Sequence, residues 1–257
     1  MKKILLATLV TATSFSALSA ESLNISVIGT INSVACTPAS SGGGVVDYGF
    51  INPSILSNTT QQGAAKGITA LDVKTVAFTV QCDGEANVAL RAKSNRGIAS
   101  DAGPMNSSGA SKIIDSTGVT KMTSGLPFTL QVKNPDVMGL GVTSEGKPIG
   151  GYMMLLPTKM ITLDGKNAVT RFYTNGQPSS STSKWTKEDS ESIHGGSINS
   201  GTAYIGYATN VTATAPEAFT SLAGTLIIRA YITDKANLNL DKPINLDGSS
   251  TIELYYY

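Results

Sequence analysis

The sequence predicts an all-β protein built as a single sandwich of two sheets. Apolar and polar residues alternate in several segments, whereas no stretch keeps a helical period over three turns. Asp-Gly and Asn-Gly pairs separate the segments and favour tight turns. The strongest alternation lies toward the two ends of the chain. This distribution favours one sandwich with a long mid-chain insertion, at about residues 96–200, over two domains.

Residues 1–20 have the pattern of a secretory signal peptide. Two lysines precede an apolar centre over residues 4–10, and small residues up to Ala20 suit cleavage after Ser19 or Ala20. The apolar centre is far shorter than the roughly 20 residues that a membrane-spanning helix requires. We therefore expect the mature chain to be exported as a soluble protein.

The charge of the chain is low and balanced. Lys and Arg number 19, Asp and Glu number 18, and charged residues make up 14% of the sequence. A basic nucleic-acid surface or a polybasic membrane anchor needs a clear excess of positive charge. Neither nucleic acid nor a membrane surface is therefore an expected partner.

Cys36 and Cys82 are the only cysteines. In an exported chain such a pair usually forms a disulfide, and a bridge over this separation would stabilise the fold by about 4 kcal/mol. The alternative is a redox or metal-binding pair. The wide spacing and the lack of a companion histidine cluster argue against that alternative.

The predicted strands follow from the alternation, in chain order. The mature chain opens with an extended segment, residues 21–31, that places Leu23, Ile25 and Val27 on one side. This strand has no partner before it, so it either completes its own domain or is given to another molecule. The later strands have these inward-facing residues: Val76, Phe78, Val80 and Cys82; Val88, Leu90 and Ala92; Leu126, Phe128, Leu130 and Val132; Leu226, Ile228, Ala230 and Ile232; and Ile252, Leu254 and Tyr256. The predicted turns are Asp83-Gly84, Asp164-Gly165, Asn175-Gly176 and Asp247-Gly248.

Trp185 is the only tryptophan and falls in the most polar segment, residues 176–196. An exposed aromatic ring in a polar loop can serve as a platform on which a sugar stacks. The alternative is that Trp185 anchors the loop onto the sandwich. The residue type and its position leave both alternatives open.

Several segments, in this order, resemble the pilins that the chaperone–usher pathway of Gram-negative bacteria assembles. They are GTINSVAC, VVDYGFINPSIL, VAFTVQCDG, GTLIIRAYITD and the closing STIELYYY. The resemblance covers roughly residues 23–93 and 222–257 and is closest to a group of larger fimbrial-like proteins. It implies an incomplete immunoglobulin-like sandwich over residues 32–257, with an open groove where the last strand is missing.

The resemblance also implies a mechanism and partners. A periplasmic chaperone would fill the groove first, and the N-terminal strand of a neighbouring subunit would replace it at the outer-membrane usher. Leu23, Ile25 and Val27 would then be donor residues, and Ile252, Leu254 and Tyr256 would form the acceptor strand. The chain departs from the pilins in two respects. The extension before Cys36 is short and has leucine at position 23, where many pilin donor strands carry glycine, and the region at about residues 96–200 adds length beyond an ordinary pilin domain.

Enzymatic function is not expected. His194 is the only histidine and lies in the polar segment, and the two Ser-x-x-Lys patterns lack companion motifs. Neither a metal motif nor a cofactor motif is present in the sequence. The expected function is a structural or minor subunit of a surface fimbria that supports adhesion. The alternative is a single-domain tip adhesin that binds a host glycan or protein receptor through the mid-chain insertion. A secreted hydrolase is a third hypothesis, and it would need clustered acidic residues.

Overall fold

The computed structural model describes residues 34–58, 68–95, 138–179, 184–189, 191, 193 and 203–257. All of them belong to one compact unit, Val34–Tyr257. The donor residues Leu23, Ile25 and Val27 and the strand predicted around Phe128 lie outside the described residues, so both remain predictions.

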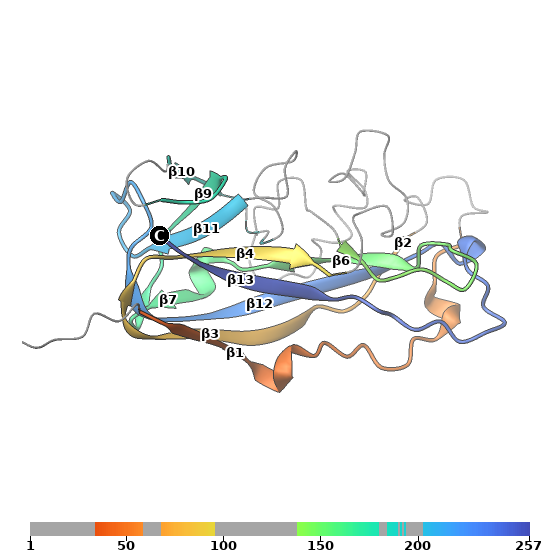
Figure 1. Cartoon of the computed structure of the whole chain (residues 1–257). Helices are drawn as coiled ribbons and strands as arrows, with labels where there is room; N and C mark the ends of the chain where they lie inside the picture. The colour runs from red at the N-terminus through yellow and green to blue at the C-terminus, as the bar shows by residue number, and fades with distance from the viewer. Residues whose placement is uncertain are drawn as a thin grey trace, which may run out of the picture. The chain divides into compact units, whose positions relative to one another are not determined.

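The described chain forms two antiparallel sheets, which confirms the predicted all-β sandwich (Figure 1). The first sheet has the order β1 (Cys36–Ser40), β3 (Lys74–Ala86), β12 (Phe219–Thr233), β6 (Gly150–Leu155) and β5 (Met138–Gly139). Three short strands extend it: β2 (Ile68–Ala70) and β7 (Ile161–Leu163), which pair with β12, and β8 (Lys166–Asn167), which pairs with β7. The second sheet has the order β10 (Thr186–Lys187), β9 (Thr170–Asn175), β11 (Ala203–Ala208), β4 (Val88–Ser94) and β13 (Ser250–Tyr256).

The helical elements among the described residues are short 3-10 segments: η1 (Ser41–Gly44), η2 (Pro53–Ile55), η4 (Thr158–Met160) and η5 (Lys235–Asn237). Within the described part of the chain, no helix is long and apolar enough to cross a membrane.

The longest strand, β12, is the centre of the first sheet. On one side it pairs with β3 and then with β2, and on the other side with β7 and then with β6. Gly150 of β6 allows the close approach of these strands, because a Cβ atom there would lie 2.0 Å from the Tyr231 carbonyl oxygen.

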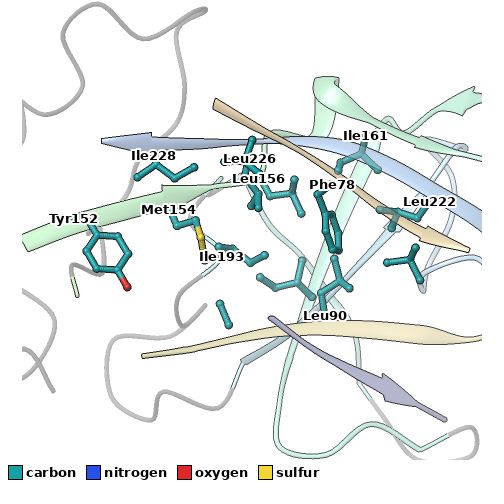
Figure 2. Close-up of a cluster of buried hydrophobic side chains, with 14 of the residues drawn as sticks. Phe78, Leu90, Tyr152, Met154, Leu156, Ile161, Ile193, Leu222, Leu226 and Ile228 are labelled. Carbon is teal, nitrogen blue, oxygen red and sulfur yellow. The ribbon is translucent and has the colours of Figure 1, made fainter. Parts of the chain in front are cut away.

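The main core lies between the two sheets. Figure 2 shows Phe78 of β3 extending toward Leu90 of β4, with Leu226 of β12 nearby and Ile228 farther along the same strand. Phe78 is 3% exposed and Leu90 is 1% exposed. The alternation predicted in β3, β4 and β12 is confirmed, because every second residue of these strands faces this core.

The second half of the segment expected as an insertion contributes strands to both sheets. Strands β5 to β10 fall between residues 138 and 187, and β6 bonds directly to the central strand. All six residues of β6 are buried. A strand covered on both faces shows no alternation of apolar and polar residues, so the pattern of the sequence does not reveal it.

The turn predictions have mixed outcomes. Asp164 and Gly165 have φ angles of 48° and 77° and connect β7 to β8, as predicted. Gly176, with φ 93°, follows the end of β9. The prediction of a turn at Asp83-Gly84 is wrong, because β3 continues through both residues to Ala86. The Asp83 carboxylate instead accepts a hydrogen bond from the Ala35 N–H at 2.8 Å, which ties it to the approach to β1.

Candidate strand-binding groove

An apolar groove of about 1180 Å³ opens between the edges of the two sheets. On one side it is bordered by β1 and the segment that follows it, and on the other by the connection from Leu238 to β13. Its floor consists of inward-facing side chains of the first sheet: Val76, Phe78, Tyr152, Met154, Leu226, Ile228, Ala230 and Ile232. The groove therefore gives direct access to the core between the sheets.

Strand β13 is an edge of the second sheet. Within the described residues it pairs with β4 alone, with Ile252 opposite Ala92 and Leu254 opposite Leu90. The Asn95 N–H donates to the Ser249 carbonyl at 2.9 Å, and the Tyr257 N–H donates to the Asn87 carbonyl at 3.2 Å. The odd-numbered residues of β13 therefore bond to β4.

Main-chain groups of alternate residues point to opposite sides of a strand. The N–H and C=O groups of Ile252, Leu254 and Tyr256 consequently point away from β4, toward the groove side. The Ile252 and Leu254 side chains pack against the core, and Ile252 also lines the groove. Among the described strands, β13 thus combines an open main-chain edge with an apolar face, as an acceptor strand requires.

The opposite edge is β1, the edge strand of the first sheet. The disulfide predicted between Cys36 and Cys82 is present, and it joins residues that lie directly opposite each other in β1 and β3. The Asp83 N–H donates to the Ala35 carbonyl at 3.0 Å, so the odd-numbered residues of β1 bond to β3. Cys36, Pro38 and Ser40 therefore direct their main-chain groups away from β3.

Tyr256 connects the two edges. The Cys36 N–H donates to the Tyr256 hydroxyl at 2.9 Å, and the hydroxyl lies 3.4 Å from the Cys36 carbonyl oxygen, to which it donates. The side chain is 43% exposed. The Tyr256 side chain thus reaches across to β1 instead of filling the core, and its role in an acceptor strand stays a prediction. We call this contact the Tyr256 clasp.

A second contact links the sheets where β13 begins. The Tyr152 hydroxyl of β6 hydrogen-bonds the Ser250 hydroxyl, and the Asp247 N–H donates to the Leu140 carbonyl at 2.9 Å. Burial raises the pKa of Tyr152, so this hydroxyl keeps its proton at neutral pH. The start of β13 is therefore fixed against the first sheet while its outer edge stays beside the groove.

The mouth of the groove is unusually apolar. Phe50 is 90% exposed, Val45 is 73% exposed and Leu240 is 38% exposed, and all three line the groove. Large apolar side chains are therefore exposed along the rim of the groove.

The terminal residues also position Trp185. Its ring packs on Tyr257 with 5.4 Å between ring centroids, and the side chain is partly buried. Burial raises the pKa of Tyr257 to about 12. This contact favours the hypothesis that Trp185 anchors its segment, while contact with a ligand remains a prediction.

The sequence did not indicate a buried charged cluster beneath this segment. Arg171 of β9 lies 3.4 Å from the Glu188 carboxylate, and its side chain is 1% exposed. Glu191 accepts hydrogen bonds from the Thr158 N–H at 2.9 Å and the Thr158 hydroxyl at 3.3 Å. These four residues are distant in sequence and form no recognisable motif. Only the fold shows that they lie together.

The main chain of the same segment joins the two sheets. The Glu188 N–H donates to the Arg171 carbonyl of the second sheet at 3.1 Å, and the Leu156 N–H donates to the Glu191 carbonyl at 2.9 Å. The Ile193 N–H also donates to the Met154 carbonyl of the first sheet at 3.0 Å. Residues 188, 191 and 193 therefore support one flank of the sandwich, and the cluster has a structural role.

The buried carboxyl group of Glu191 predicts a pH dependence. Burial raises its pKa, while hydrogen bonds from Thr158 and the charges of Arg171 and Lys159 oppose the shift. The folded state therefore binds a proton more readily than the unfolded chain, so stability from this group is present at low pH and is lost as pH rises. We expect wild type to gain stability relative to Glu191→Gln as pH falls from 7 to 4, measured by urea unfolding. A stability difference that stays constant over this range would contradict the prediction.

Among the described side chains, no group of three or more His, Cys, Asp or Glu residues is placed to hold a metal ion. His194 lies outside the described residues.

Comparisons with known proteins identify a family and relatives of this chain. Residues 25–153 match a protein family whose description is "Protein of unknown function (DUF1120)". Protein GltF of Escherichia coli (strain K12) is 27% identical over 263 residues, covering 94% of this chain and 92% of GltF. Uncharacterized protein YhcF of the same organism is 28% identical over 152 residues, covering 57% of this chain and 55% of YhcF. No solved structure matches the chain.

Proposed function

This chain belongs to the DUF1120 family, and from that premise we propose that it is a structural or minor subunit of a surface fimbria that accepts a strand from another molecule. The observation that carries the proposal is the open edge of β13, among the described strands, beside an apolar groove. A strand added there would satisfy the main-chain groups of Ile252 and Leu254 and pack against the apolar lining of the groove.

The donor would be the N-terminal extension of a neighbouring subunit, which is residues 21–31 in this chain. Its side chains Leu23, Ile25 and Val27 alternate at the spacing that a groove of this kind admits. Burying three aliphatic side chains is worth about 5 to 9 kcal/mol before the cost of ordering the strand. Such a joint would be stable enough to link subunits in a fibre.

The proposal includes export, partners and the absence of catalysis. The Cys36–Cys82 disulfide suits an oxidising compartment, so we place the protein in the periplasm and then at the cell surface. A periplasmic chaperone would cover the groove before assembly, and an outer-membrane usher would exchange it for the donor strand. The protein would act by binding and not as an enzyme.

The direct test is the binding of a synthetic peptide with the sequence of residues 21–31. We expect saturable binding to the mature protein, measured by fluorescence anisotropy of a labelled peptide. The peptide should also stabilise the protein against heat, by about 2.7 kcal/mol at 100 times the Kd. A peptide with aspartate in place of Ile25 should not bind, because a charge cannot enter an apolar groove without a partner.

A pair of protein variants makes the test specific to the groove. Ile252→Asn places a polar side chain at the groove and should weaken binding at least tenfold. Glu253→Gln is the matched control, because Glu253 is the next residue of β13 and its side chain is 44% exposed. Binding that both variants preserve, or the absence of any binding by wild type, would overturn the proposed function.

A further inference from the structure

Strand β1 presents an edge with few main-chain groups available for a ladder of hydrogen bonds. Its outward-facing residues are Cys36, Pro38 and Ser40, because the odd-numbered residues bond to β3. Both main-chain groups of Cys36 are already bonded to the Tyr256 hydroxyl. Pro38 has no N–H to donate. The extended conformation ends after Ser40, where η1 begins.

Strand β13 offers the opposite situation. Its outward-facing residues Ile252 and Leu254 each have an N–H and a C=O directed to the groove side, and neither residue is a proline. The edges that border the groove therefore differ: β13 can bind a strand through its main chain, whereas β1 is protected against strand addition by Pro38 and by the Tyr256 clasp.

We infer that the groove binds a single extended peptide segment that hydrogen-bonds through its main chain to β13 alone and ends at the Tyr256 clasp. This inference rests on the proposed function and specifies how the same site recognises its partner. The side of the incoming strand that faces β1 makes only side-chain contacts, with the apolar rim at Val45 and Phe50. Recognition then depends on the aliphatic side chains on one face of the strand and on every second main-chain group.

A scan of the peptide with N-methylated amides tests this arrangement. In an added strand, successive N–H groups point alternately to its two neighbours. We expect methylation at alternate positions of the 21–31 peptide to weaken binding about tenfold, because it removes hydrogen bonds to β13. Methylation at the intervening positions should change the Kd less than twofold. Similar losses at successive positions would show bonding on both sides and would overturn the inference.

Two variants examine the protected edge directly. Pro38→Ala restores an N–H on the groove side of β1, and Tyr256→Phe releases the main-chain groups of Cys36 while keeping the ring. We expect each variant to bind the unmodified peptide more tightly and to become sensitive to methylation at a previously tolerant position. Thr37→Ala is the matched control, because the main-chain groups of Thr37 face β3.

The outcomes distinguish the inference from the proposed function. If wild type binds none of the peptides, the strand-acceptor function itself fails and the inference falls with it. If wild type binds and the alternating pattern is absent, the acceptor function stands and the one-sided arrangement is wrong. Thermal unfolding of each variant without peptide shows whether a loss of binding reflects a loss of fold.

Discussion

Removing the Cys36–Cys82 disulfide is expected to lower the free energy of unfolding by about 4 kcal/mol. The bridge closes a loop with a sequence separation of 46, so its loss increases the conformational entropy of the unfolded chain. Loss of the bridge also weakens the attachment of β1, which pairs only with β3 among the described strands. We expect the double variant Cys36→Ser, Cys82→Ser to show this loss in urea unfolding at pH 7.

A control and a second readout define the origin of the effect. Thr37→Ser alters an exposed side chain of the same strand and should change stability by less than about 0.5 kcal/mol. Treating wild type with a reductant should reproduce the loss seen in the double variant. Retention of full stability in the double variant would mean that the main-chain pairing of β1 holds the strand without the bridge.

The second large effect is expected at Arg171, because its charge is buried beside Glu188. Replacing it by methionine keeps the apolar stem but leaves the Glu188 carboxylate, whose side chain is 12% exposed, without this cation. Breaking a buried ion pair by removing one partner costs about 3 to 5 kcal/mol. We expect Arg171→Met to lose stability in this range in thermal and urea unfolding, and Trp185 fluorescence to report the release of the neighbouring segment.

The matched control is an ion pair of the same sheet that is open to solvent. Arg91 lies 4.0 Å from Glu253, and their side chains are 26% and 44% exposed. Arg91 also lies 5.6 Å from the centroid of the Tyr204 ring. Arg91→Met should therefore cost at most about 1 kcal/mol. Equal losses of stability for Arg171→Met and Arg91→Met would show that burial does not govern the contribution of Arg171 to the free energy of unfolding.

The sequence predicted those strands that are covered on one face. Val76, Phe78 and Val80 alternate with exposed residues because only one face of β3 contacts the core. The same logic identified Ile252 and Leu254 as the inward face of β13. Val76, Phe78 and Ile252 line the groove, so this part of the candidate site can be recognised from the alternation of apolar and polar residues alone.

The rest of the groove depends on tertiary contacts that no local pattern records. Strand β6 is buried on both faces and carries no alternation, so the pattern places it in an insertion. The floor residues Tyr152 and Met154 belong to it. The exposed Phe50 lies in a segment without regular structure, where neither period nor turn chemistry indicates a role. The Tyr256 clasp depends on the positions in space of two segments from opposite ends of the sequence.

The central position of β12 determines the order in which this protein can fold. Thr225 pairs with Ala77 on one side and Arg229 pairs with Met153 on the other, so the first sheet closes only when residues near the C-terminus arrive. Pairings between residues so distant in sequence form slowly. Until β12 has paired with them, β3 and β6 lack the strand that lies between them in the sheet. During this time their apolar faces can contact other chains. A chain exported from its N-terminus would spend this interval exposed, and protection by another protein during export would lower the risk of aggregation.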